Sequence, residues 1–421
     1  MSGGPVSLNP PQQVGGSASG GVSGAQILAI APTPFFGDYG CHVRIVEEIT
    51  ALQTHGVGTE LLTYPFGRDI AGIKTHRSPR LPGQQAVSPG SSVHKLWMDA
   101  ALSASAVGLV ARTRPDLIHG HLHEGALIGW AVGRPRRTPI VFDFQGSLTA
   151  EMVDHGFLTP SSPSFALFRR IEQWVVAHAD AVITSTSHGA DVLMRQFGCP
   201  TDRITVVPDA VNSTRFCPIG ERPAGSVDDQ REVLRARLGL TADRPIVVYL
   251  GLLAEYQGIT HLLRAAEALK ERKVDAHFLI MGYPGEDRYR VLAHRLGLGD
   301  RVTFTGAIRY EEAPDYLALG TVAVAPKLSL TEGNGKLLNY MSMGLPTLAY
   351  DSPVSREILG ELGVYAPPGD WTALSIELEA MLREPAALTQ RGRALRAKAA
   401  CQHTWEQAIE PLVALYQGLL G

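Results

Sequence analysis

The sequence predicts an α/β protein made of two doubly wound domains, and three observations lead to this fold class. The chain has 421 residues, more than one compact core usually holds, since cores stop growing near roughly 250 to 300 residues. Short apolar runs alternate with longer amphipathic stretches, a pattern typical of parallel strands covered by helices. After Pro218 a polar stretch with glycine and proline interrupts this pattern, which indicates a domain boundary.

The first series of strands and helices begins after residue 24. An apolar run at 25–32 precedes a helix in which Val43, Val46 and Ile49 share one face, and a strand at 56–65 completes a βαβ unit. Further strands are expected at 116–121, 139–144, 181–186 and 204–209, with a helix at Ser164–Ala177.

A second series follows the boundary. Strands are expected at 244–251, 276–282, 301–306, 322–326 and 346–351, with helices at Ile259–Lys273, Arg288–Leu296 and Leu337–Met343. We therefore expect a flexible tail at 1–24, a first domain at 25–216 and a second at 217–402. Two such domains facing each other would form a cleft between the carboxyl ends of their sheets.

Composition excludes several classes of protein. Hydrophobic residues make up 45% and charged residues 19%, so a disordered, collagen-like or coiled-coil chain is excluded. The formal net charge of −3 gives no global positive field, and no nucleic-acid partner is expected. The four cysteines lack the spacing of a metal site or a disulfide scaffold, which favours a reduced, cytoplasmic protein. No stretch reaches the roughly 20 apolar residues of a membrane-spanning helix.

The most informative segment is APKLSLTEGNGKLLNYMSMGLPTLAYD, residues 325–351. A loop after a predicted strand carries Glu332, and Gly333–Gly335 open the next helix. Glycines let the backbone approach a ligand closely, and free N–H groups at a helix start attract anions. A carboxylate beside an anion site suits a ligand with hydroxyls and a diphosphate. The alternative is an ordinary capped helix with a solvated Glu332 and a surface Lys336.

Three histidines, His119, His121 and His123, follow one predicted strand at alternate positions. If the strand extends that far, alternation would point all three to one side and suggest zinc, but such positions lie roughly 7 Å apart, too far for one metal ion to bind all three. We therefore expect no metal. Gly37 and Gly40 occupy an earlier strand-to-helix turn without the GxGxxG pattern of a dinucleotide enzyme. A tight turn alone would also explain these two glycines.

The ordered succession of motifs resembles retaining glycosyltransferases of the GT-B fold, specifically family 4 (glycosyl transferases group 1). The likeness is carried by residues 115–123, 206–216, 250–265, 278–287, 296–308, 325–351, 367–374 and 403–408. It implies two Rossmann-like domains facing a central cleft, with acceptor binding in the first domain and donor binding in the second. It also implies that the final helix, Trp405–Leu420 within 403–421, packs back onto the first domain.

The resemblance assigns roles to individual residues. Glu332 and His121 are expected catalytic residues by this resemblance, and Lys336 is added to them as a candidate replacement for a missing cation. Donor binding falls to Gly37, Gly40, Gln257, Gly306, Ile308, Gly333, Asn334, Gly335, Leu337 and Asn339. Gln145, Gly146 and Ser187 are expected on the acceptor side, although Ser187 also suits a helix cap.

The chain departs from the family pattern at three positions. Asn339 stands where relatives carry a second Glu that grips the ribose, while Leu252 and Gln257 stand where they carry an Arg and a Lys that neutralise the leaving diphosphate. Lys336 and Lys327 are candidates to replace those cations, and the alternative is that both are solvated.

The resulting expectation is a retaining glycosyltransferase of the hexosyltransferase class that needs neither a metal nor another cofactor. Its partners would be a nucleotide-sugar donor and a glycan, lipid-linked or small-molecule acceptor. The alternative is a binding protein that keeps the cleft but has lost turnover, as the three departures would allow. Lys95, Trp97 and Met98 suggest at most a peripheral membrane contact at the inner face of the membrane.

Overall fold

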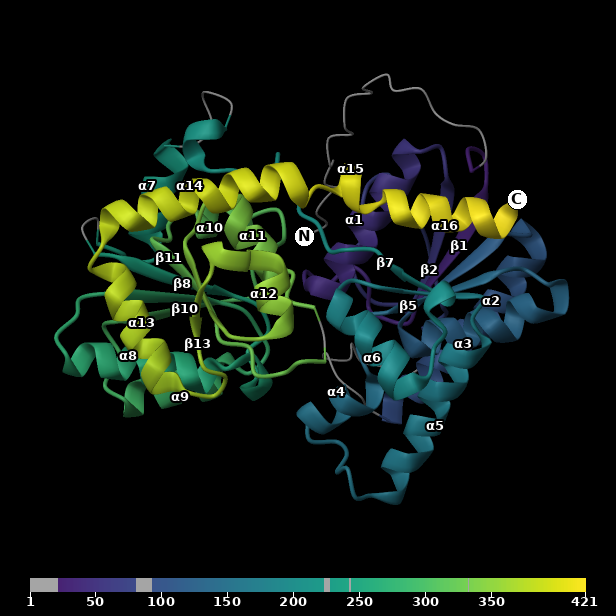
Figure 1. Ribbon diagram of the computed structural model, residues 1–421, viewed down its shortest axis with the longest axis horizontal. Helices are drawn as coiled ribbons and strands as arrows, with labels where there is room; N and C mark the ends of the chain where they lie inside the picture. The colour runs from purple at the N-terminus through teal and green to yellow at the C-terminus, as the bar shows by residue number, and fades with distance from the viewer. Residues whose placement is uncertain (1–21, 81–92, 223–227, 242–243, 332) are drawn as a thin grey trace.

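The computed structural model describes residues 22–80, 93–222, 228–241, 244–331 and 333–421. Figure 1 shows two lobes side by side, each built around a sheet flanked by helices. Every strand pair in both sheets is parallel. The predicted fold class, two doubly wound α/β domains, is confirmed.

The first sheet has the strand order β3-β2-β1-β4-β5-β6-β7. Its strands are β1 (Gln26–Ala31), β2 (Gly58–Thr63), β3 (Lys74–Arg77), β4 (Leu117–His121), β5 (Ile140–Phe144), β6 (Ala181–Thr184) and β7 (Ile204–Val206). Its helices are α1 (Gly40–Thr54), α2 (Val93–Thr113), α3 (Leu122–Gly133), α4 (Leu148–Asp154), α5 (Pro163–His178) and α6 (Ser187–Phe197). The central strands β4 and β5 are buried along their whole length, as expected where helices cover both faces of a sheet.

The second sheet has the order β10-β9-β8-β11-β12-β13. Its strands are β8 (Ile246–Leu250), β9 (His277–Met281), β10 (Val302–Gly306), β11 (Val322–Ala325), β12 (Thr347–Tyr350) and β13 (Val364–Ala366). The α-helices of this lobe are α7 (Asp228–Arg237), α8 (Ile259–Glu271), α9 (Glu286–Arg295), α10 (Ala313–Leu317), α11 (Lys336–Ser342), α12 (Pro353–Leu359), α13 (Trp371–Leu382) and α14 (Pro385–Gln402). Single 3-10 turns lie at Arg134–Arg136, Thr201–Arg203, Ile219–Glu221, Glu255–Gln257 and Gly360–Leu362.

Two strands were missed by the sequence analysis, and both lie at sheet edges. The strand β3 reads KTHR and has no buried residue, so it carries no apolar signal. The strand β13 is three residues long, too short for an alternation to show. Edge strands are held by backbone hydrogen bonds to one neighbour, which a hydrophobic pattern does not reveal.

The end of the chain returns to the first lobe. Helix α14 lies along the second lobe, whereas α15 (Trp405–Ala408) and α16 (Glu410–Leu420) lie along the first (Figure 1). Leu412 and Tyr416 belong to the same buried cluster as Leu117 and Val141 of the first sheet. The structure divides the predicted helix Trp405–Leu420 at Ile409, because Pro411 has no N–H to continue the hydrogen-bond ladder.

Packed structure begins before the end of the predicted tail. Val22 is buried in the cluster that holds Ile27, and the Gly24 N–H donates to the Gly56 carbonyl at 2.9 Å. The remainder of the predicted tail, residues 1–21, lies outside the described residues.

Candidate functional site

A cavity of about 390 Å³ lies between the two lobes. The first lobe contributes the loop after β1, the start of α1 and the segment that leads into α4, while the second contributes the loop after β8 and the start of α11. These segments all follow the carboxyl ends of parallel strands, where ligands bind in open α/β sheets.

Lys336 stands at the centre of the second-lobe wall. Its Nζ donates to Gln257 Oε1 at 2.7 Å and to the Tyr249 hydroxyl at 3.2 Å, and it lies 4.6 Å from the centre of the Tyr249 ring. A Cβ added to Gly251 would lie 2.8 Å from this Nζ, so the ammonium rests directly against the loop backbone after β8. The cation therefore occupies the neighbourhood of Leu252 and Gln257, although it comes from α11.

The loop before α11 is held by a different lysine. Lys327 is buried, and its Nζ donates to the Gly333 carbonyl at 2.8 Å, so it fixes the loop rather than lining the cavity. Asn334 is also buried and lines the cavity, and its Oδ1 has no hydrogen-bond partner among the described residues. A buried amide oxygen without a partner costs free energy unless a ligand or water satisfies it. Glu332 lies outside the described residues.

Several contacts join the lobes beside the cavity. The Tyr283 hydroxyl donates to the Gly37 carbonyl at 2.7 Å, and the Tyr310 N–H donates to Asp38 Oδ1 at 2.9 Å. Arg68 forms ion pairs with Asp38 and with Glu311 of the second lobe, at 2.7 and 2.9 Å. The turn after β1 is thus tied to the second lobe through both its backbone and its charge.

In the first-lobe wall, a buried arginine is surrounded by carboxylates. Arg44 of α1 lies 2.6 Å from Asp209 and 3.7 Å from both Asp143 and Glu48. Burial would raise the pKa of Asp143, but Arg44 and a hydrogen bond to His121 outweigh it and hold that pKa well below the usual range. Burial raises the pKa of Glu48 to about 7, with Arg44 acting against the rise.

His121 is linked to the cavity through its neighbours. Its Nδ1 lies 2.9 Å from Asp143 Oδ2, and the same oxygen accepts a hydrogen bond of 2.6 Å from Gln145, which lines the cavity. On its other side the ring stacks on His119, whose Nδ1 lies 2.7 Å from the Tyr416 hydroxyl of α16. A continuous polar chain therefore runs from the C-terminal helix to the cavity.

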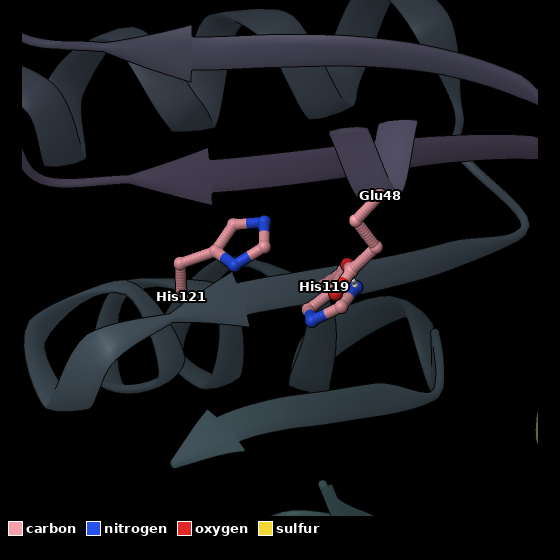
Figure 2. Close-up of side chains that lie close together, drawn as sticks. All are labelled: Glu48, His119 and His121. Atoms are coloured by element: carbon pink, nitrogen blue, oxygen red, sulfur yellow. Dashed lines mark ion pairs between the residues drawn. The ribbon is translucent and has the colours of Figure 1, made fainter. Parts of the chain in front are cut away.

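Glu48, His119 and His121 bring possible metal-ligand atoms within 4.8 Å of one another (Figure 2). The two imidazole rings are only 4.3 Å apart at their centres, so the expected spacing of roughly 7 Å between alternate strand positions was wrong for these side chains. However, the two rings are stacked with planes only 21° apart, so their lone pairs lie in separate, nearly parallel planes, which is unfavourable for binding one ion between them. The adjacent Arg44 already supplies positive charge to the carboxylates of Glu48 and Asp143.

His123 does not share a side with the other two histidines, because the strand does not extend far enough for the alternation to reach it. The strand β4 ends at His121, and Leu122 takes a positive φ of 60°. This turns His123 toward Glu172, 3.5 Å away, and against the ring of Phe142. A period-two pattern holds only while the strand continues.

Nine of the predicted site residues line the cavity together: Gly40, Gln145, Gln257, Ile308, Gly333, Asn334, Gly335, Lys336 and Asn339. Six described ones lie outside its lining: Gly37, His121, Gly146, Ser187, Gly306 and Leu337. The Ser187 hydroxyl and N–H donate to Glu357, so this residue joins the lobes away from the cavity. Leu337 is fully buried in the hydrophobic core.

Sequence reasoning missed other residues of the lining. Tyr283 and Arg309 line it from the second lobe, and Arg44, Lys95 and Glu151 line it from the first. Tyr283 lies within the motif at 278–287, and Arg309 directly follows the motif at 296–308, so both could have been found from the sequence. The other three come from helices whose positions only the fold reveals.

The expected membrane-facing trio is divided by the structure. Met98 is buried and Lys95 pairs with Glu124, while Trp97 is 66% exposed beside an exposed Leu96. Of the three residues, Trp97 alone is an exposed apolar side chain of α2. Among the described helices, none has the length and hydropathy needed to cross a membrane.

Two doubly wound lobes, a cavity between the carboxyl ends of their sheets and a glycine-bearing loop before α11 define a GT-B glycosyltransferase. Residues 39–210 match the family described as glycosyl transferase 4-like domain, and residues 230–398 match glycosyl transferases group 1. The chain belongs to family 4 of the GT-B glycosyltransferases.

Individual relatives cover almost the whole chain. A 2-deoxystreptamine glucosyltransferase of Streptomyces kanamyceticus is 26% identical, over 90% of this chain and 99% of its own length. A D-inositol 3-phosphate glycosyltransferase of Nocardia farcinica is 28% identical, over 92% and 86%. Among solved structures, the sucrose-phosphate synthase of Thermosynechococcus elongatus has a TM-score of 0.79 at 21% identity, over 94% and 99%. Anabaena Alr3699/HepE in complex with UDP-glucose has a TM-score of 0.73 at 16% identity, over 93% and 99%.

Proposed function

We propose that this glycosyltransferase is a retaining, metal-independent enzyme of the hexosyltransferase class that uses a nucleoside diphosphate sugar. The observation that carries the proposal is the ammonium of Lys336 against Gly251 and Gln257, facing the cavity between the lobes. The complex of Alr3699/HepE with UDP-glucose supports a donor of this type.

Lys336 supplies the positive charge on the donor side. As the bond between the sugar carbon and the phosphate oxygen breaks, negative charge builds on the leaving diphosphate. Leu252 and Gln257 cannot neutralise it, whereas a lysine already directed into their neighbourhood can. No divalent cation is then required for charge stabilisation.

The leaving phosphate itself acts as the base. The acceptor oxygen forms a bond to the sugar carbon on the face from which the phosphate departs, and the acceptor proton passes to a phosphate oxygen. The protein orients both substrates and excludes water. In the proposed roles, Glu332 and Asn334 hold sugar hydroxyls, Asn339 contacts the ribose, and Gly333 and Gly335 lie near the diphosphate.

The first lobe receives the acceptor. Gln145 lines the cavity and is held by Asp143, which also orients His121, so these residues position the acceptor end of the site. The names of two relatives, acting on 2-deoxystreptamine and on D-inositol 3-phosphate, point to a cyclitol as one kind of acceptor. Glycan and lipid-linked hydroxyls are the other kinds proposed. The wide spacing of the four cysteines along the sequence fits a cytoplasmic location.

The test is acceptor-dependent release of nucleotide from a panel of UDP- and GDP-sugars, measured with and without EDTA. We expect release that requires both substrates and that EDTA leaves unchanged. Tight donor binding without release across the panel would instead indicate the binding protein that has lost turnover. Loss of release on chelation, restored by a divalent cation, would contradict metal independence.

A further inference from the structure

The first-lobe wall of the cavity contains one charge cluster that the transfer step does not use. Tyr64 after β2, Lys95 of α2 and Glu151 of α4 line the cavity. Behind them, Lys95 forms an ion pair with Glu124, and the Tyr64 hydroxyl donates to Asp99. Within the part of the chain that the structure describes, the carboxylates of Asp99, Glu124 and Glu151 all act on the ammonium of Lys95.

The charges in this cluster act on one another. Burial alone would lower the pKa of Lys95, yet the pKa is raised, because Glu124, Asp99 and Glu151 all stabilise the ammonium. Burial raises the pKa of Asp99 to about 6, with Glu124 adding to the rise. Even so, its carboxylate is mostly ionised at neutral pH. The cluster as a whole carries excess negative charge.

Among the described residues of this wall, each cation is already paired with a carboxylate and is not available to receive an anionic acceptor. Arg44, the second cation in the first-lobe part of the lining, forms an ion pair of 2.6 Å with Asp209 and lies 3.7 Å from Asp143. Lys95 is already paired with Glu124. A phosphate placed here would lie close to carboxylates, and the two nearby cations, Arg44 and Lys95, already pair with other carboxylates. Repulsion between these negative charges would disfavour phosphate binding in a partly dehydrated cavity.

Glu151 lies where the wall meets the donor side. A Cβ added to Gly146 would come within 2.6 Å of both Glu151 Oε1 and the Thr331 carbonyl oxygen. The absence of a side chain at Gly146 therefore lets the carboxylate approach the loop that precedes Glu332. A positively charged group bound at Glu151 would keep neighbouring hydroxyls of the same molecule close to the reacting sugar.

We propose that this wall selects an acceptor that carries a protonated amine beside its hydroxyls, with Glu151 as the carboxylate that receives the ammonium. This inference rests on the proposed function, which makes the cavity the site of sugar transfer, and it adds the chemical class of the acceptor. Charge-assisted hydrogen bonds of this kind change affinity by roughly tenfold to a hundredfold.

Binding measured without turnover tests the inference separately from the reaction. The probes are 2-deoxystreptamine, its N-acetylated form, myo-inositol and myo-inositol 1-phosphate, titrated calorimetrically into protein saturated with UDP or GDP. We expect 2-deoxystreptamine to bind at least about tenfold more tightly than the other three. Equal or tighter binding of either inositol probe, or of the N-acetylated form, would overturn the proposed amine selection.

The variant Glu151→Gln keeps the size and hydrogen-bonding shape of the side chain and removes its charge. We expect it to reduce 2-deoxystreptamine binding by roughly tenfold and to change myo-inositol binding by less than about twofold. Equal loss for both probes would refute the role of Glu151. Nucleotide release is recorded in parallel: amine-selective binding without release contradicts the proposed function alone, and release driven by the phosphate probe contradicts the amine inference alone.

Discussion

Replacing Lys336 by methionine removes the cation proposed to stabilise the leaving diphosphate while keeping most of the side-chain volume. At an effective dielectric constant of about 20, a charge about 4 Å from a phosphate contributes about 4 kcal/mol. Part of this is already present when the donor binds, so we expect kcat to fall by roughly tenfold to several hundredfold. Donor affinity should change less.

A relocated cation gives the sharper test. Because Lys336 Nζ lies 2.7 Å from Gln257 Oε1, a lysine at position 257 would bring its ammonium to nearly the same place. We expect Gln257→Lys to restore much of the kcat lost in Lys336→Met. Lys74→Met is the matched control, since it makes the same change in net charge at a 65% exposed lysine on the edge strand β3.

The assay is nucleotide release at saturating donor, with thermal unfolding to confirm that each variant is folded. Unchanged kcat in Lys336→Met would refute the charge argument. A folded double variant that binds donor but shows no recovery would mean that Lys336 acts through its contacts with Tyr249 or Gln257 rather than through its charge.

Three further predictions concern stability. Gly258→Ala should cost roughly 2 to 4 kcal/mol in urea unfolding, because φ is +78° and the new Cβ would lie 1.9 Å from the Pro326 carbonyl oxygen; an unchanged midpoint would contradict this. Tyr416→Phe should cost about 1 to 2 kcal/mol by the same measurement, since it removes the hydrogen bond to His119; no loss would show that bond to be neutral. Glu48 has a pKa raised from 4.5 to about 7, so the native state favours the protonated carboxyl. The contribution of this preference to the free energy of unfolding is full below pH 4.5 and is lost as pH rises through about 7. Urea midpoints of Glu48→Gln between pH about 5 and about 8 should lack that decline, and a decline equal to the parent's would exclude Glu48 as its source.

The parts of the fold that follow from local sequence were predictable. Strands such as β1, β4 and β8 are short apolar runs because helices cover both faces of each sheet. The cavity residues Gly333–Lys336 were predicted because glycines next to a helix start form a local motif. Local pattern and local structure coincide at these places.

The remaining contacts of the candidate site depend on how distant segments pack, which a local sequence pattern does not reveal. Glu48 meets His119 and His121 because α1 packs on the face of the sheet that carries both rings. Glu151 reaches the site because Gly146 leaves room for it, and Lys336 reaches Gln257 because they follow β11 and β8, which are neighbours in the second sheet. The contacts of Glu48 and of Lys336 join segments far apart in sequence, so only the assembled fold reveals them.

The anomeric configuration of the transferred sugar tests directly whether the enzyme retains the configuration of the donor. With an α-linked nucleotide sugar as donor, NMR of the isolated product reports the configuration of the new bond through the coupling constant at its anomeric carbon. Transfer on the same face of the sugar predicts an α-linked product, formed with stoichiometric release of the nucleoside diphosphate in the presence of EDTA. A β-linked product would contradict the same-face transfer on which the proposed roles of Lys336 and the leaving phosphate depend.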